Sequence, residues 1–230
     1  MPQLANYTQV LIAYVAPFVA YMLFSMLESR GWFGVGYEAV YTIKTALVAG
    51  TLCAYRRYYP AFSTKGFGPA LIAGALGCVL WIVLARLQAA LPALQHLIDS
   101  FQGARAAYNP FTDDAPQAAR IAFIIVRLIG LTVIVPVMEE IFWRGFLSRY
   151  LISDRFNDVP QGTFTPLSFA IVVAAFTAVH PEILAAIAWC TVVNALYRQT
   201  ANLWACVVMH AVTNGLLGGY ILATGNWQLW

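Results

Sequence analysis

The sequence is poor in charged side chains, and this absence excludes several classes of protein. Asp, Glu, Lys and Arg together make up 10% of the 230 residues, whereas hydrophobic residues make up 61%, and the mean hydropathy is +0.70. A soluble domain carries about a quarter charged residues, so the deficit indicates that lipid surrounds most of the chain. The net charge of +3 is small and the basic residues are scattered, which argues against nucleic acid as a partner.

Cysteine is also scarce, and its spacing excludes the common metal and redox motifs. Cys53, Cys78, Cys190 and Cys206 lie in apolar runs, and none of them shows C-x-x-C spacing, which is typical of zinc or redox sites. We expect all four to be small buried hydrophobic side chains. The first basic residue, Arg30, follows the first apolar run, so the sequence predicts no cleavable signal peptide.

Apolar runs of membrane-spanning length predict an all-α polytopic membrane bundle of about seven transmembrane helices, with a range of six to eight. About 20 apolar residues cross the hydrocarbon layer. The expected helices cover residues 7–27, 38–55, 69–90, 117–152, 165–180, 183–197 and 201–223. No polar linker divides the chain, so we expect one integral membrane domain over 1–230. Its parts would be N-terminal helices (1–91), an extramembrane loop with a short amphipathic helix (92–119) and a C-terminal core (120–217).

Four residues within or near these runs lead to individual predictions. Lys44 lies near the start of its run, and we expect it to snorkel toward the headgroups rather than to point into the bundle. His96 is expected to be a surface histidine. Arg127 should reach the far membrane surface, where water can solvate its charge. Pro136 should kink its helix, because proline removes a backbone hydrogen bond.

Two adjacent carboxylates and an arginine follow the most apolar stretch of the chain. Glu139 and Glu140 are two of only five glutamates, and ionisable groups at membrane depth indicate a functional site by default. Glu140 precedes Arg144 by four residues, the favourable order for an ion pair on one helix face. Glu139 lies about 100° around the helix axis from Glu140, and therefore on a different face. We therefore expect Arg144 to neutralise Glu140 while Glu139 faces a wet cavity as a general base. Alternatively, all three form an ion cluster that only holds helices together.

Two histidines in apolar runs carry polar or aromatic partners at helical spacing. His180 follows Phe176 by four residues and His210 precedes Asn214 by four, so each pair projects from one helix face. Either histidine alone would more often be a hydrogen-bonded packing residue. However, with a rise of about 1.5 Å per residue, Glu139, His180, His210 and Asn214 fall roughly 14 to 22 Å below one interface. We therefore expect these four side chains to meet in one layer near the middle of the bilayer.

The three patterns, in this order, resemble the motifs of the CPBP family. This family contains the CAAX prenyl endopeptidases and the bacteriocin-processing-type intramembrane proteases. Its pattern is E-E-x-x-x-R, then F-x-x-x-H, then H-x-x-x-N, standing here as Glu139-Glu140…Arg144, Phe176…His180 and His210…Asn214. The resemblance covers roughly residues 120–217 and extends to the stretch from Tyr197 to Trp204. The amino-acid sequence of residues 140–147 also resembles that of a bacterial branch of the family, which is associated with C-terminal sorting signals and exosortase-type systems.

The resemblance implies intramembrane proteolysis by a glutamate, without a cofactor. Glu139 and His180 would activate a water molecule, and His210 and Asn214 would stabilise the oxyanion. The substrate would be a membrane-anchored or lipidated protein cleaved near its C-terminus. The protein would be a multi-pass component of the bilayer, in the inner membrane of a bacterium. Its oligomeric state stays open.

The resemblance implies supporting roles for three further residues, and at other positions the sequence departs from the family's pattern. Glu140 and Arg144 would orient the site, and Phe176 belongs to the second motif. Cys190 and Asn194 stand in a helix where many family members carry small, glycine-like residues. Likewise, residue 201 is an alanine where a glycine commonly follows the threonine.

Two other classes of function remain open. In a zinc-dependent intramembrane protease, His180, His210 and one glutamate would bind the metal, although no H-E-x-x-H motif is present. In a non-catalytic membrane scaffold or immunity-type binding protein, the polar cluster would serve stability alone. A transporter is less favoured, because no half-to-half repeat suggests alternating access.

Overall fold

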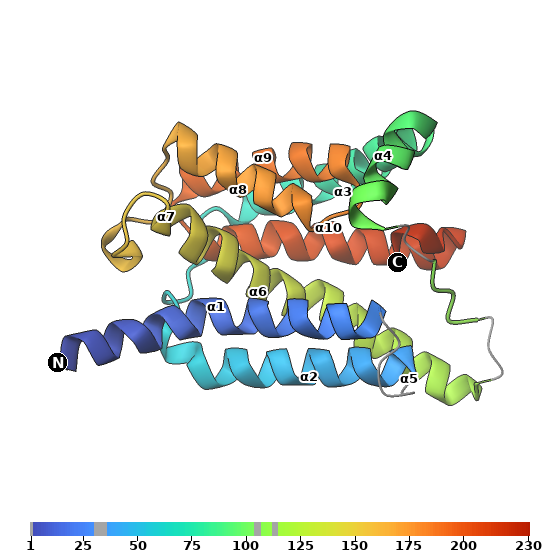
Figure 1. The fold of residues 1–230 in the computed structure, drawn as a ribbon, viewed down its shortest axis with the longest axis horizontal. Helices are drawn as coiled ribbons and strands as arrows, with labels where there is room; N and C mark the ends of the chain where they lie inside the picture. Colours follow the sequence, from blue (N-terminus) through green and yellow to red (C-terminus); the bar gives the residue numbers. More distant parts are fainter. Residues whose placement is uncertain (1, 30–35, 104–106, 112–114) are drawn as a thin grey trace.

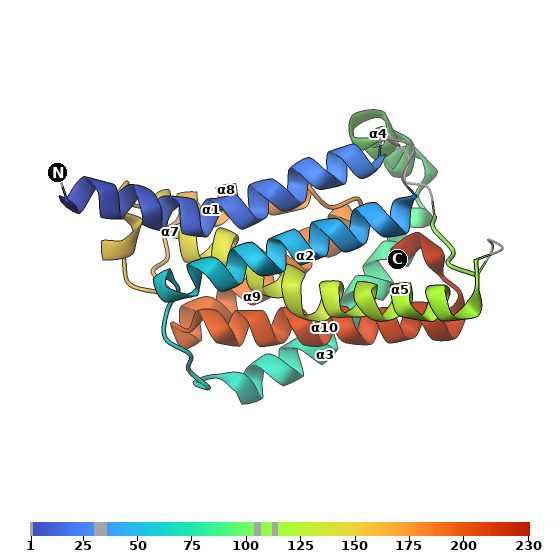
Figure 2. The same cartoon turned by 90° about the horizontal axis from the view of Figure 1, so that it is seen from below.

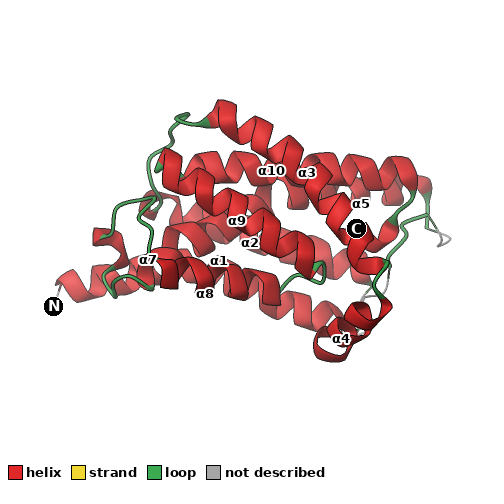
Figure 3. Cartoon of the chain, turned by 90° about the horizontal axis from the view of Figure 1, so that it is seen from above, coloured by secondary structure: helices red, strands yellow, loops and turns green. Residues whose placement is uncertain are grey.

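The computed structural model describes residues 2–29, 36–103, 107–111 and 115–230, and these are 81% helical and contain no strand. The predicted all-α fold is therefore confirmed. The helices also follow the predicted apolar runs closely, and loops gather at the two ends of the bundle (Figure 3).

The N-terminal half contains α1 (Pro2–Ser29), α2 (Tyr37–Tyr55), α3 (Phe67–Ala89) and α4 (Pro92–Gln102). The C-terminal half begins with a long helix composed of α5 (Gln117–Ile129), η3 (Gly130–Ile134), α6 (Val135–Glu140), η4 (Ile141–Leu147) and α7 (Ser148–Tyr150). It continues with α8 (Pro166–Ala178), α9 (Ile183–Thr200) and α10 (Leu203–Thr224). Short 3-10 turns cover η2 (Arg56–Tyr58), η5 (Phe156–Asp158) and η6 (Trp227–Leu229).

The long helix crosses the molecule between two groups of helices (Figure 1). On one side of it, α1 packs against α2; on the other side, α3 packs against α9 and α10, and α8 packs against α9. Seen from below, α5 runs alongside α2 (Figure 2), and the η3 and α6 parts of the long helix pack against α10. The long helix carries Glu139 and Glu140, so both groups of helices can contribute to the surroundings of the carboxylates.

The long helix is interrupted by two π-helical segments rather than broken. One segment, η3, directly precedes α6, in which Pro136 lies, and the other, η4, directly follows Glu140. Proline has no N–H, and its ring crowds the carbonyl four residues earlier, which explains why the widened turn lies before Pro136. Single π turns inside α-helices occur frequently at functional sites. Here they flank both carboxylates.

Glycines allow α3 to approach the site helices closely, as expected where helices pack in membranes. A Cβ on Gly74 would lie 2.7 Å from the carbonyl oxygen of Met209 in α10. A Cβ on Gly77 would lie 3.0 Å from both Thr213 Oγ1 and Trp189 Nε1. Any larger residue at these positions would push α3 away from α9 and α10.

The protein is an integral membrane protein, since its long helices are apolar on their outward faces too. Within the part of the chain that the structure describes, four helices are long and apolar enough to cross a membrane: Tyr7–Met26, Phe67–Ala89, Gln117–Tyr150 and Leu203–Thr224. On α3 the exposed side chains include Ile72, Leu76 and Val79. The predicted count of seven spans is not confirmed. In particular, α8 has only 13 residues, which span about 20 Å and do not cross the hydrocarbon layer alone.

The prediction that Lys44 snorkels is wrong. Its side chain is 2% exposed and points into the bundle, where Nζ donates a hydrogen bond to Ser25 Oγ at 3.2 Å. The same nitrogen lies 4.5 Å from the ring centroid of Tyr21 and 4.8 Å from that of Tyr41. Aromatic faces stabilise a desolvated cation, so these rings allow an interior position that the sequence pattern did not reveal.

The expectation for Arg127 is also wrong, because this side chain is 5% exposed rather than solvated. Its guanidinium lies over the rings of Tyr37, Tyr41 and Trp230, at 5.5, 5.0 and 4.9 Å from their centroids. It also donates a hydrogen bond to the hydroxyl of Tyr37. As with Lys44, tyrosine rings brought together by packing replace water around the charge.

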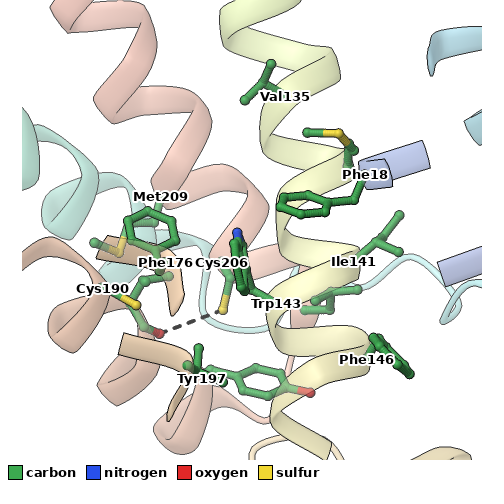
Figure 4. Close-up of a cluster of buried hydrophobic side chains, with 14 of the residues drawn as sticks. Phe18, Val135, Ile141, Trp143, Phe146, Phe176, Cys190, Tyr197, Cys206 and Met209 are labelled. Atoms are coloured by element: carbon green, nitrogen blue, oxygen red, sulfur yellow. Dashed lines mark hydrogen bonds between the residues drawn. The ribbon is translucent and has the colours of Figure 1, made fainter. Parts of the chain in front are cut away.

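The core is built around the long helix, α8, α9 and α10, and it extends to α1, α2 and α3. Figure 4 shows Trp143 pointing from the long helix toward Cys206 and Phe176. Three of the four cysteines are buried as predicted, whereas Cys53 is exposed, contrary to the prediction. His96 is exposed on α4, as predicted. Because the core reaches both sides of Trp143, it fixes the rotation of the long helix about its own axis.

Candidate active site

Glu140 and Arg144 form the ion pair that their spacing predicts. Arg144 Nη1 lies 3.1 Å from Glu140 Oε2 and 3.2 Å from Oε1, and both side chains are fully buried. Glu140 has a second partner, since Oε1 lies 2.9 Å from His210 Nδ1. The carboxylate therefore lies between an arginine on its own helix and a histidine on α10.

Each of the three side-chain nitrogens of Arg144 has a hydrogen-bond partner. Nε donates to Asn194 Oδ1 at 3.2 Å, and Nη2 donates to Cys190 Sγ at 3.2 Å. The guanidinium lies 5.5 Å from the ring centroid of Phe176 and 5.9 Å from that of Trp189. A buried charge requires such complete pairing. Cys190 and Asn194, which depart from the resemblance, thus act here as partners of the motif arginine.

Glu139 differs from its neighbour because one of its oxygens has neither a hydrogen bond nor an ion-pair contact among the described residues. Glu140 Oε2 also makes no hydrogen bond, but it lies 3.1 Å from Arg144 Nη1. The side chain of Glu139 is 7% exposed, yet among the described residues its Oε2 makes no hydrogen bond. Buried polar atoms are nearly always bonded, so each exception needs an explanation. A carboxylate oxygen held out of water without a partner is poised to accept a proton or a hydrogen bond from a small polar molecule.

His180 lies just beyond the end of α8, and its imidazole has a defined tautomer. Nδ1 lies 2.7 Å from the backbone carbonyl oxygen of Phe176. A carbonyl oxygen can only accept, so Nδ1 carries the hydrogen and the neutral ring keeps its lone pair on Nε2. The ring also stacks on Phe176, with 4.1 Å between centroids and 21° between planes. Phe176 thus holds His180 through both its backbone and its side chain.

Aromatic rings connect the two histidines across three helices. Beyond Phe176 the next ring is Trp189 on α9, at 5.5 Å between centroids, and Trp189 lies 4.7 Å from His210 on α10. Trp189 Nε1 is anchored by a hydrogen bond to Thr213 Oγ1 at 3.1 Å. These contacts limit rotation of either imidazole.

Asn214 lies one turn beyond His210 and is tied to the first π-helical segment. Its Nδ2 donates to the backbone carbonyl oxygen of Leu131 at 2.9 Å. An amide nitrogen carries two hydrogens, so one N–H remains for another acceptor. The widened helical turn supplies the carbonyl that fixes the orientation of Asn214.

The predicted residues are only partly brought into direct contact. Glu140 and Arg144 meet His210, and Phe176 meets His180, whereas no hydrogen bond or ion pair within the described residues joins Glu139 to either histidine. A zinc site is not assembled either, because the described residues contain no group of three or more His, Cys, Asp or Glu side chains placed to hold a metal.

Sequence reasoning missed the residues that support the site. Trp189 connects Phe176 to His210, and Cys190 and Asn194 bind Arg144. The signal for the last two was present, because a cysteine and an asparagine four residues apart share one face of an otherwise apolar helix. No comparable signal distinguishes Trp189 from an ordinary core residue.

Comparison with known proteins agrees with the motifs. Residues 121–216 match the model of a family described as Rce1-like, type II CAAX prenyl endopeptidase. No curated protein and no solved structure matches the chain. The matched segment contains every predicted site residue and leaves α1 to α4 outside.

Proposed function

We propose that the protein is a glutamic intramembrane endopeptidase, because residues 121–216 match the model of the Rce1-like family of type II CAAX prenyl endopeptidases. The observation that carries the proposal is the contrast between the two adjacent carboxylates. Glu140 is bonded to Arg144 and His210, whereas Glu139 keeps one buried oxygen without a partner among the described residues. A cluster that served stability alone would not need the second carboxylate.

Glu139 is the proposed general base, with His180 as its partner. Glu139 would take a proton from water while the water oxygen forms a bond to the scissile carbonyl carbon. The tautomer of His180 supports this role, because its Nε2 lone pair can accept a hydrogen bond from the same water. General bases contribute about 10²- to 10⁴-fold to such reactions. When the carbon–nitrogen bond breaks, the proton passes from Glu139 to the leaving amine.

His210 and Asn214 are the proposed stabilisers of the oxyanion. The remaining N–H of Asn214 can donate to it while the other stays on Leu131. His210 can donate from Nε2 when its ring is protonated, because Nδ1–H is already directed at Glu140. Donors fixed before the reaction stabilise developing charge without reorganisation.

Charge balance explains why an arginine and a second glutamate are needed. With Glu139 ionised and His210 protonated, the two carboxylates are matched by Arg144 and the imidazolium. The site is then neutral overall before water attacks. Burial of an unmatched charge would be costly, so Glu140 and Arg144 allow His210 to carry its charge inside the bundle.

The proposed substrate is a membrane-anchored or lipidated protein, cleaved near its C-terminus. The apolar outward faces of the long helices are compatible with a substrate that arrives through the bilayer. No cofactor enters the proposed reaction. A bacterial inner membrane as the location stays a prediction.

The test compares cells that produce the wild-type chain, Glu139→Gln or no protein at all. Mass spectrometry of membrane-anchored proteins should find C-terminally shortened products only with the wild type. Glu38→Gln changes a glutamate on α2, outside the motifs and far along the chain from them, and serves as the control that keeps activity. Cleavage retained by Glu139→Gln would rule out the base assignment. Wild-type cells without any product, at normal protein levels, would favour a scaffold.

A further inference from the structure

We propose that Gln88, at the end of α3 and outside the Rce1-like segment, is a positioning residue that holds the turn carrying His180. The catalytic importance of His180 rests on the proposed function, whereas the contacts of Gln88 are observed in the structure and do not depend on that function. The turn in question covers residues 179–182, between α8 and α9. Its backbone determines where the imidazole lies, because His180 is no longer part of a helix.

Gln88 binds the turn at Pro181 and at the start of α9. Its Nε2 donates to the Pro181 carbonyl oxygen at 2.9 Å, and its Oε1 accepts from the backbone N–H of Leu184 at 3.3 Å. The side chain is 3% exposed, so water does not compete for these bonds. Leu184 lies in the first turn of α9, whose N–H groups have no partner within the helix. One amide therefore joins α3 to the turn and to the start of α9.

A second residue of α3 contacts the imidazole itself. Trp81, seven residues before Gln88, meets the His180 ring edge to face, with 5.7 Å between centroids and 72° between planes. Seven residues correspond to two helical turns, so both residues lie on the face of α3 that is turned toward α8 and α9. The imidazole thus lies against Phe176 of α8 and Trp81 of α3.

Helix α4 completes the arrangement from outside. Gln95 Oε1 accepts from Gln88 Nε2 at 3.2 Å, and Gln95 Nε2 donates to Asp99 Oδ1 at 2.8 Å. Gln102 Nε2 lies 3.4 Å from the carbonyl oxygens of both Ala178 and His180. The amphipathic helix predicted in the extramembrane stretch therefore covers the turn. Its glutamines fix which way the amide of Gln88 points.

A purely structural explanation is that Gln88 only caps α9. Such a cap would contribute to stability alone and would not change the chemistry selectively. A positioning residue acts differently, because a misplacement of about 1 Å can cost about 100-fold in rate. The two explanations therefore predict different results for two measurements, namely the chemical modification rate of His180 and the kcat for substrate cleavage.

The first arm of the test does not depend on activity. Diethyl pyrocarbonate modifies neutral imidazole, and the three histidines of the chain differ in burial: His96 is exposed, His180 intermediate and His210 buried. In a Glu139→Gln background, Gln88→Met should raise the modification rate of His180 about threefold or more, since local opening increases reactivity. His96 and His210 should keep their rates. An unchanged or lower rate at His180 would overturn the proposal.

The second arm measures turnover in the otherwise wild-type chain. Gln88→Met should lower kcat about tenfold or more while KM changes by less than about twofold. Gln199→Met changes an exposed glutamine on α9 and should leave both constants unaltered. If Gln88→Met does not fold, Gln95→Leu, on the surface helix, releases the amide of Gln88 and should produce the same two effects to a smaller degree. A fall in stability without either effect would show that Gln88 is only a cap.

The two arms separate the possible failures. If Glu139→Gln still cleaves substrate, the proposed function is wrong, but the rate of His180 modification still decides the role of Gln88. If cleavage depends on Glu139, but Gln88→Met changes neither the modification rate of His180 nor kcat, only the positioning role is wrong.

Discussion

The Nδ1 atom of His210 lies 2.9 Å from Oε1 of Glu140 and makes no hydrogen bond to the neighbouring Glu139. Glu140 therefore has a charged or polar partner on two helices, whereas Oε2 of Glu139 has no hydrogen-bond or ion-pair partner among the described residues. The contact between His210 and Glu140 also joins the first and third motifs directly, through one bond between the long helix and α10.

Glu140→Gln should destabilise the protein more than Glu139→Gln. Removing the Glu140 carboxylate leaves Arg144 buried without its counter-charge, and breaking a buried pair in this way costs about 3–5 kcal/mol. Glu139→Gln breaks no ion pair and should change the free energy of unfolding by less than about 1 kcal/mol. Thermal or denaturant unfolding in detergent would measure both. Equal losses in the two variants would contradict the division of roles.

Asn194→Leu should lower both stability and activity. The change removes the acceptor of Arg144 Nε, and a buried donor left without a partner costs about 1–3 kcal/mol. We expect a several-fold loss of cleavage because Arg144 then holds Glu140 less firmly. Thr191→Val, on the exposed face of the same helix, is the matched control. A silent Asn194→Leu variant would mean that Cys190 and Glu140 alone suffice to hold the guanidinium.

Gly74→Ala and Gly219→Ala should have opposite effects, although both glycines lie within helices. A Cβ at position 74 would lie 2.7 Å from the backbone oxygen of Met209, whereas position 219 has nothing within 4 Å. We expect Gly74→Ala to lose about 1–3 kcal/mol through overpacking. Gly219→Ala should gain up to about 1 kcal/mol from helix propensity. Unfolding in detergent again provides the measurement, and a stable Gly74→Ala variant would argue against the close crossing of α3 and α10.

Metal chelators should leave cleavage unaffected. In the proposed reaction a carboxylate and an imidazole activate the water, and Glu140, which a metal would compete for, is already bound to Arg144. Activity assays with increasing chelator, followed by addition of zinc, would test this. Inhibition that zinc reverses would support the zinc-dependent protease instead.

The sequence alone determined those features that depend on neighbours along one helix. The ends of the helices followed from apolar runs and turn residues, and the Glu140–Arg144 pair followed from four-residue spacing, because helical geometry fixes which side chains share a face. The three motifs likewise identified the segment that the family comparison matched.

Only the tertiary structure decided which faces of different helices meet. His210 bonds to Glu140, Asn194 binds Arg144, Gln88 holds the turn after His180, and Lys44 points inward. Each of these contacts depends on how a helix is rotated about its axis and where it crosses its neighbours. Periodicity within one helix does not contain that information, since packing against the other helices sets both rotation and crossing.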